Sequence, residues 1–125
     1  MTPSRYWSVP ASFREMPIMD VPQITVAELA IRLASGTGTV LLDVRPADEW
    51  LRVSIPGSLH IPAAELPRRI HELDPDAPTA VICHFGIRSI AAAAFLLEQD
   101  FDDVCSVTGG IDLYARDVAT ELPRY

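Results

Sequence analysis

Short apolar runs alternate with helix-forming segments along most of the chain. Two of these runs, at residues 39–45 and Thr79–Ile82, are continuous in apolar and β-branched side chains, which is typical of strands buried on both faces. Weaker runs at 58–61 and 103–107 are also predicted to be strands. Because these runs alternate with helices, we predict an α/β fold, an open parallel sheet with helices on both faces.

Helix signals fill the intervals between the predicted strands. Thr25 and Glu28 have the spacing of a capping box, which begins a helix that we expect to end at Gly36. Ser89 begins an alanine-rich helix that is expected to end near Gln99. Further helical segments are predicted at 47–51, after Pro46, at 67–73, and at 111–117, after a turn at Gly109 and Gly110.

The first 21 residues differ from the rest of the chain in composition. Prolines at positions 3, 10 and 17 disfavour regular structure, whereas Tyr6, Trp7 and Phe13 are unusual for a disordered tail. We predict an N-terminal arm over residues 1–21 that lies on the domain or on a second subunit of a homodimer. Residues 22–125 are predicted to form a single domain, ending in an ordered cap at 122–125.

Composition narrows the classes of function. A chain of 125 residues, 49% of them hydrophobic, has the size and the core of one ordinary domain. The net charge of −7 argues against a nucleic-acid-binding protein. No apolar run has the length of a membrane span, and the first residues lack the apolar segment of a signal peptide, so we expect a cytoplasmic protein.

The cysteines and histidines do not have the spacing of a disulfide framework or a metal site. Two cysteines, Cys83 and Cys105, are too few for such a framework, and no two of them stand in a Cys-x-x-Cys pair. The histidines His60, His71 and His84 show no ligand spacing either. We therefore expect no metal and no other cofactor.

The segment Cys83 to Ser89 carries the candidate chemistry. It connects the Thr79–Ile82 strand to the alanine-rich helix, and so places a thiol at a helix N-terminus, where unpaired N–H groups and the helix dipole favour an anion. Cysteines in such positions are more acidic than free cysteine. We expect Cys83 to be a nucleophile rather than an inert core residue. Arg88 has two open roles, which are binding an anionic substrate and forming a structural ion pair with Asp43 or Glu49.

Four segments of the chain resemble the rhodanese-like sulfurtransferases in their order and rough spacing. They are Leu42-Asp-Val-Arg45 with Glu49, Ile55-Pro-Gly-Ser58 with Ile61-Pro62, Cys83-His-Phe-Gly-Ile-Arg-Ser89, and Gly109-Gly110 followed by Tyr114. The resemblance as a whole spans about residues 21–125, which is nearly everything except the arm. The chain departs from the family pattern at Val53-Ser54, where Gly-His is usual, and at Tyr114, where Trp is usual.

The resemblance implies a sulfurtransferase that uses a persulfide. Cys83 would take a sulfur from a small anionic donor such as thiosulfate and pass it to cyanide, a thiol or a protein. Asp43 and Arg45 would hold neighbouring loops in place, with a secondary substrate role open for Arg45. The loop would hold the persulfide and the donor, mainly through N–H groups of residues 84 to 88, and its residues are His84, Phe85, Gly86, Ile87, Arg88 and Ser89.

Individual loop residues carry further expectations. His84 and Phe85 are expected to expose their side chains at the mouth of the site. Gly86 is expected to adopt a backbone conformation that other residues avoid. Cys105 is interpreted as a core residue, and a resolving thiol for Cys83 is the minority alternative.

Other functions stay open at this point. Cysteine phosphatases and arsenate reductases place one residue more between cysteine and arginine than the four that separate Cys83 from Arg88, and the smaller loop fits a sulfur atom better than a phosphoryl group. A sulfur-carrier module that serves a protein partner would use the same cysteine chemistry, and exposed apolar residues around Phe85 would favour it. An inactive domain is the third alternative, against which the presence of Cys83 and Arg88 argues.

Overall fold

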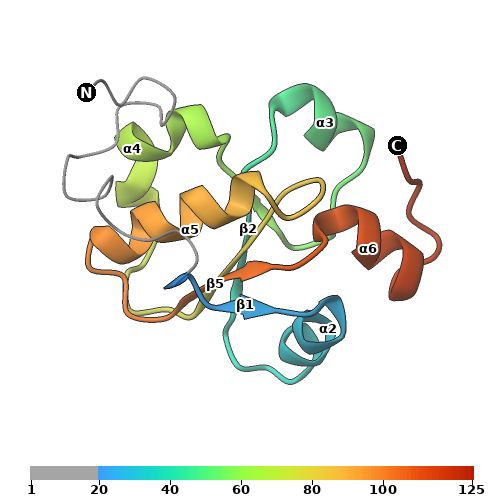
Figure 1. Cartoon of the computed structure of the whole chain (residues 1–125), viewed down its shortest axis with the longest axis horizontal. Coiled ribbons are helices and arrows are strands. Elements are labelled where there is room, and N and C mark those ends of the chain that lie inside the picture. The colour runs from blue at the N-terminus through green and yellow to red at the C-terminus, as the bar shows by residue number, and fades with distance from the viewer. Residues whose placement is uncertain (1–19) are drawn as a thin grey trace.

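The computed structural model describes residues 20–125, which are built around a five-stranded parallel sheet (Figure 1). The strands follow the spatial order β1-β5-β4-β2-β3, so that β4 is central, with β5 on one side and β2 on the other. The predicted open α/β sheet is confirmed. The strands are β1 (Gln23–Ile24), β2 (Val40–Asp43), β3 (Leu59–His60), β4 (Thr79–Ile82) and β5 (Val104–Val107).

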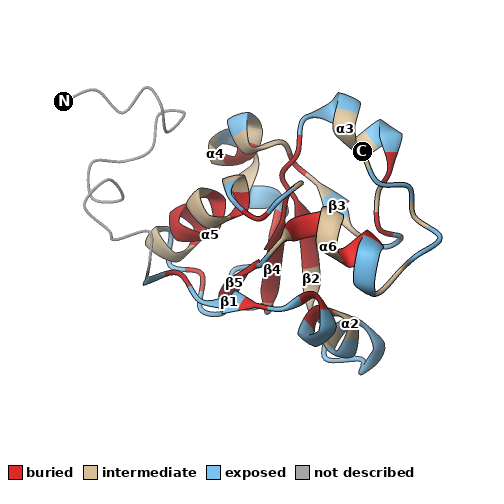
Figure 2. Cartoon of the chain, turned by 45° about the vertical axis from the view of Figure 1, so that its right-hand side comes forward, coloured by how far each residue is buried: buried red, intermediate tan, exposed pale blue. Residues whose placement is uncertain are grey.

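Helices cover both faces of the sheet, as predicted (Figures 1 and 2). They are α2 (Val26–Ala34), α3 (Ala47–Arg52), α4 (Leu66–Arg69), α5 (Arg88–Glu98) and α6 (Gly110–Asp117), and short 3₁₀ turns at Ala63–Glu65 and Ile70–Glu72 flank α4. Thr25 caps α2 with the predicted capping box, in which its hydroxyl accepts the Glu28 N–H at 3.1 Å.

Side chains of successive strand residues enter two separate cores. Leu42 and Val81 pack with the alanines of α5 and with Leu66 of α4. Leu41 and Ile82 instead pack with α2 and α6. All four residues of β4 and of β5 are buried, which explains why these strands lack an apolar and polar alternation (Figure 2). The sheet therefore holds the carboxyl end of β4 rigidly between two packed layers.

The structure differs from the predicted elements mainly at their ends. β1, which the sequence analysis did not predict, has two residues and pairs only with β5, and a strand this short leaves no periodic pattern. The strand predicted at 58–61 is confined to Leu59–His60. The last helix begins at Gly110, which was assigned to the preceding turn. The arm prediction concerns residues 1–21, of which 1–19 lie outside the described residues.

Candidate active site

Cys83 directly follows β4 at the carboxyl end of the central strand, and it is 1% exposed. Two backbone N–H groups donate to its sulfur, from Gly86 at 3.2 Å and from Ser89 at 3.3 Å. The Ser89 hydroxyl lies 3.3 Å from the same sulfur. The segment from Cys83 to Ser89 thus curls around the thiol and directs hydrogen-bond donors at it. Such donors stabilise negative charge on the sulfur.

Glycines allow two backbone segments to meet beneath this loop. Gly86 has φ +90°, as its predicted role requires, and a Cβ there would lie 2.7 Å from the backbone nitrogen of Gly109. Gly110 has φ +60°, and a Cβ there would collide with the carbonyl oxygens of Cys83 and His84. Those two oxygens accept hydrogen bonds of 2.8 and 3.0 Å from N–H groups in the first turn of α6. The Gly-Gly motif therefore docks α6 against the cysteine loop.

Arg88, the first residue of α5, is tied to α3 by an ion pair. Its two terminal nitrogens lie 3.1 and 3.0 Å from the two carboxylate oxygens of Glu49. The hydrogen bonds to Glu49 raise the pKa of Arg88. In return, the hydrogen bonds from Arg88 hold the pKa of Glu49 below its ordinary value, against the opposing effect of burial. The structural role that was one alternative for Arg88 is thus present, with Glu49 as the partner.

Asp43 and Arg45 form an ion pair inside the protein, with side chains 1% and 0% exposed. A nitrogen of Arg45 lies 2.7 Å from Asp43 Oδ2 and also donates to the carbonyl oxygen of Val53 at 2.6 Å. Burial alone would lower the pKa of Arg45, but hydrogen bonds to Asp43 and Tyr125 raise it. Arg45 further donates to the carbonyl oxygen of Glu49 at 3.2 Å. It therefore fastens the end of β2 to α3, which favours the supporting role over contact with a substrate.

Tyr125 joins these parts, although the sequence analysis assigned it only to an ordered cap. Its hydroxyl accepts a hydrogen bond from Arg45 at 2.8 Å and donates one to Glu49 at 2.7 Å. Its ring stacks on His84, with ring centroids 3.8 Å apart and planes 8° apart. Tyr125 therefore contacts the residue after the cysteine directly and reaches Arg88 through Glu49. No local sequence signal reveals a contact between residues 76 positions apart.

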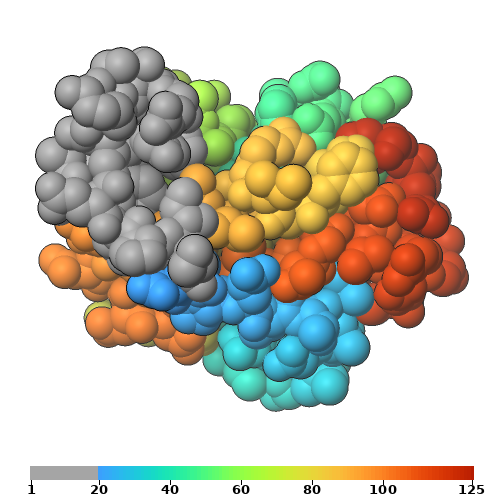
Figure 3. Space-filling model, in the orientation of Figure 1, coloured from blue at the N-terminus to red at the C-terminus, as the bar shows by residue number. Residues whose placement is uncertain are grey.

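The loop side chains are only partly as expected. His84 is half-buried rather than exposed, because it stacks between Phe85 and Tyr125 and its Nε2 lies 3.0 Å from the Tyr125 carbonyl oxygen. Phe85 is 57% exposed and Ile87 is 75% exposed. In Figure 3 the yellow to gold atoms of this part of the chain lie at the surface, between the green of α3 and the red C-terminal residues. Two exposed apolar side chains thus lie on the loop that holds a buried thiol.

Cys105 lies apart from this site. It is 3% exposed and packs with Leu29 and Leu41 in the core on the α2 and α6 face, whereas Cys83 belongs to the core on the α5 face. Burial raises the pKa of the Cys105 thiol. This environment supports its interpretation as a core residue.

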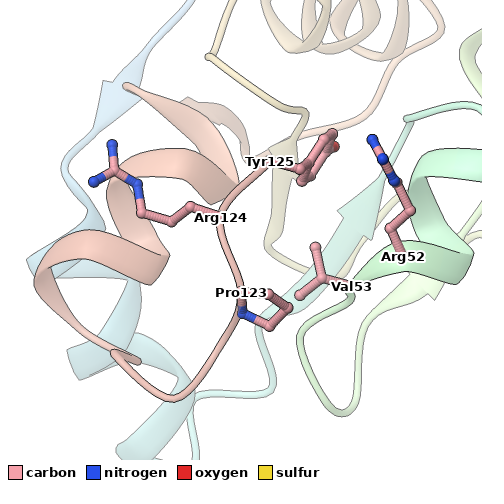
Figure 4. Close-up of a pocket in the computed structure, with 5 residues that line it drawn as sticks. All are labelled: Arg52, Val53, Pro123, Arg124 and Tyr125. Carbon is pink, nitrogen blue, oxygen red and sulfur yellow. The ribbon is translucent and has the colours of Figure 1, made fainter.

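An open pocket of about 330 Å³ adjoins the Tyr125 side chain (Figure 4). Arg52 and Val53 line it from the end of α3, and Pro123 and Tyr125 line it from the C-terminal segment, with the Arg52 guanidinium carbon 5.4 Å from the centre of the tyrosine ring. Arg124 extends away toward α6, where it pairs with Asp112 at 3.0 Å. Across residues 20–125, no cluster of three or more potential metal ligands occurs, and no helix is long and apolar enough to cross a membrane.

A family model for the rhodanese-like domain matches residues 25–117. The chain belongs to the rhodanese-like family. This rhodanese-like domain is 38% identical over 87 residues to a thiosulfate sulfurtransferase, GlpE, of Pseudomonas putida, an alignment that covers 70% of this chain and 79% of the relative. It is 34% identical over 91 residues to a putative sulfur carrier protein, YrkF, of Bacillus subtilis, covering 73% of this chain and 49% of that one.

A comparison with solved structures agrees with this family assignment. A rhodanese-related protein from Thermoplasma volcanium superimposes with a TM-score of 0.71 at 33% identity, covering 78% of this rhodanese-like chain and 93% of the other. Three of the four segments that suggested the family meet around the cysteine loop, because Arg88 pairs with Glu49 and Gly110 packs against the carbonyl oxygen of Cys83. At the two departures from the family pattern, the carbonyl oxygen of Val53 accepts a hydrogen bond from Arg45, and Tyr114 is buried.

Proposed function

We propose that this rhodanese-like protein is a sulfurtransferase that carries a sulfane sulfur as a persulfide on Cys83. The observation that supports this most directly is that the buried Cys83 sulfur accepts hydrogen bonds from the backbone N–H groups of Gly86 and Ser89. A sulfur that accepts hydrogen bonds is favoured as an anion, and the thiolate is the nucleophilic form of cysteine. The similarity to thiosulfate sulfurtransferases supports the same class of reaction.

The proposed reaction consists of two displacements. The Cys83 thiolate attacks the outer sulfur of thiosulfate, a new S–S bond forms, the S–S bond of thiosulfate breaks, and sulfite leaves with the electron pair. A thiophilic acceptor then attacks the terminal sulfur of the persulfide, and Cys83 leaves as a thiolate. With cyanide as acceptor the product is thiocyanate, and neither step transfers a proton. A cytoplasmic location, where thiols stay reduced, suits this chemistry.

The loop supplies the binding groups in this proposal. The N–H groups of Gly86 and Ser89 stabilise the charge on the Cys83 sulfur before the first step and after the second. Arg88 directs two of its five N–H groups to Glu49. The remaining N–H groups can bind the anionic group of thiosulfate. Because Glu49 offsets the charge of Arg88, we expect weak binding of thiosulfate, with a KM that rises with salt.

A sulfur-carrier function for a protein partner is the second candidate. The exposed side chains of Phe85 and Ile87 favour it, because apolar surface binds another protein but not a small hydrated anion such as thiosulfate. The similarity to a putative sulfur carrier protein points the same way. In both candidates the sulfur is held on Cys83, and they differ in what removes it.

The deciding experiment compares wild type, Cys83→Ser and Cys105→Ser in thiosulfate:cyanide sulfurtransfer, read as thiocyanate. Cys105→Ser is the matched control, because it removes the other buried thiol. We expect thiocyanate from wild type and from Cys105→Ser, none from Cys83→Ser, and one added sulfur on Cys83 after thiosulfate alone. Equal activity in all three proteins would overturn the proposal. A stable added sulfur without turnover would assign the carrier function, and hydrolysis of an aryl phosphate would instead support a phosphatase.

A further inference from the structure

Ser106 is a buried polar residue on the mainly apolar face of the sheet that packs beneath α5. It lies on β5, two residues after Val104, so that both side chains point toward the core beneath α5. Ser106 is 0% exposed, and its hydroxyl lies 2.8 Å from the hydroxyl of Ser89, which is also 0% exposed. Within residues 20–125 the Ser106 side chain makes no other hydrogen bond. An apolar side chain would fill this position without burying a hydroxyl.

The two serines and the cysteine form one buried chain of polar atoms. Cys83 Sγ lies 3.3 Å from Ser89 Oγ, which lies 2.8 Å from Ser106 Oγ. Both ends of this chain are buried, because Cys83 is 1% exposed and Ser106 is 0% exposed. The state of the sulfur therefore decides which way both hydroxyl protons point.

We propose that Ser106 is a positioning residue for Cys83 that acts through Ser89, by means of a hydroxyl chain that reverses when the thiol ionises. In the thiol form, the Cys83 S–H donates to Ser89 Oγ, and the Ser89 O–H donates to Ser106 Oγ. When Cys83 loses its proton to solvent, the Ser89 O–H turns to the sulfur and the Ser106 O–H turns to Ser89. No bond between heavy atoms changes, and each serine keeps its own proton.

Position 106 needs a hydroxyl for this, since only a group that both accepts and donates serves the two states. In the thiolate form, the hydrogen bond from Ser106 polarises the Ser89 hydroxyl and strengthens its donation to the anion. The same arrangement stabilises the thiolate that leaves when an acceptor removes the persulfide sulfur. The inference rests on the proposed role of Cys83 as a nucleophile, but it does not depend on the identity of the donor or acceptor.

The test measures the rate of Cys83 alkylation by iodoacetamide against pH. All proteins carry Cys105→Ala, so that Cys83 is the only thiol. The reference is compared with Ser106→Ala, Ser89→Ala, the double variant and Thr79→Val. Thr79→Val is the matched control: it removes a hydroxyl from a residue that is 2% exposed, on the adjacent strand, whose bond goes to Ala77 instead. Thiolate absorbance in the ultraviolet follows the same titration without a reagent.

Ser106→Ala should move the midpoint of both curves to higher pH and slow alkylation on the acid side by about two- to tenfold, the effect of one hydrogen bond. Ser89→Ala should have a larger effect, and Ser106→Ala should add nothing to it in the double variant. Thr79→Val should leave the curves unchanged. An unchanged curve for Ser106→Ala, or an equal shift in the presence and absence of Ser89, would overturn the inference. Alkylation is independent of sulfur transfer, so its result stands apart from that of the Cys83→Ser assay.

Discussion

Replacing Arg45 by Met should destabilise the fold far more than the same change at a surface arginine. Arg45→Met keeps a side chain of similar length and removes the charge that neutralises Asp43, whose side chain is 1% exposed. Of the hydrogen bonds that Arg45 gives to Asp43, the one from its backbone N–H at 3.0 Å would remain. The carbonyl oxygens of Glu49 and Val53 would each lose a donor.

The expected loss in the free energy of unfolding follows from these contacts. Leaving a buried charge without its partner costs about 3–5 kcal/mol. Arg69→Met is the matched control, because Arg69 has ion pairs of similar length, 2.9 Å to Glu65 and 2.8 Å to Glu72, but on the surface. Exposed pairs contribute about 0–1 kcal/mol, so Arg69→Met should lose no more than that.

Urea unfolding followed by circular dichroism at neutral pH measures both losses. An Arg45→Met loss below about 1.5 kcal/mol, or one no larger than that of Arg69→Met, would refute the reasoning, since it would mean that Asp43 is not left as an uncompensated buried charge. The double variant Asp43→Leu/Arg45→Met separates charge from packing. It should lose less than the sum of the two single variants, because it removes both charges together.

Two further predictions concern the ties around the loop. Tyr125→Phe, which keeps the ring on His84 and loses both hydroxyl hydrogen bonds, should lower the free energy of unfolding by about 1–2 kcal/mol with little change in thiocyanate production. Tyr125→Ala, which also removes the stacked ring, should slow production several-fold, and equal rates for the two variants would contradict a role for the ring. Arg88 holds the pKa of Glu49 below its ordinary value of 4.5. The ion pair therefore stabilises the fold above pH 4.5, and this stabilisation is lost as the pH falls and Glu49 takes up a proton. The difference between wild type and Glu49→Gln in urea unfolding, about 1 kcal/mol near pH 7, should therefore shrink below about pH 4.5, and a difference that grows on acidification would contradict this.

The sequence predicted the central fold because its signals are local. β4 was predicted with its observed limits, Thr79–Ile82, since a short run of buried β-branched residues between a proline and a loop has few alternatives. The capping box at Thr25 was predicted for the same reason. β1 escaped prediction because its two residues are ordered by pairing with β5, at the other end of the chain, and not by their own pattern.

The candidate site was predictable where its residues are consecutive, and not where the fold brings distant residues together. The loop from Cys83 to Ser89 could be placed from the strand pattern before it and the helix pattern after it. His84 stacks on Tyr125, which is 41 positions away, and the hydroxyl of Ser89 meets that of Ser106, which is 17 positions away. Nothing in the local sequence indicates either contact. The half-burial of His84 was missed for this reason, since its covering ring comes from the C-terminal segment.

Charge compensation around the loop separates the proposed sulfur chemistry from phosphoryl transfer. Holding a phosphoryl group calls for positive charge from an arginine, but Glu49 offsets the charge of Arg88 and accepts two of its five N–H donors. Arg45 is likewise occupied by Asp43. The backbone N–H groups of Gly86 and Ser89, in contrast, converge on one atom, the Cys83 sulfur. This geometry favours a reaction in which the charge stays on sulfur over one that spreads charge across phosphoryl oxygens.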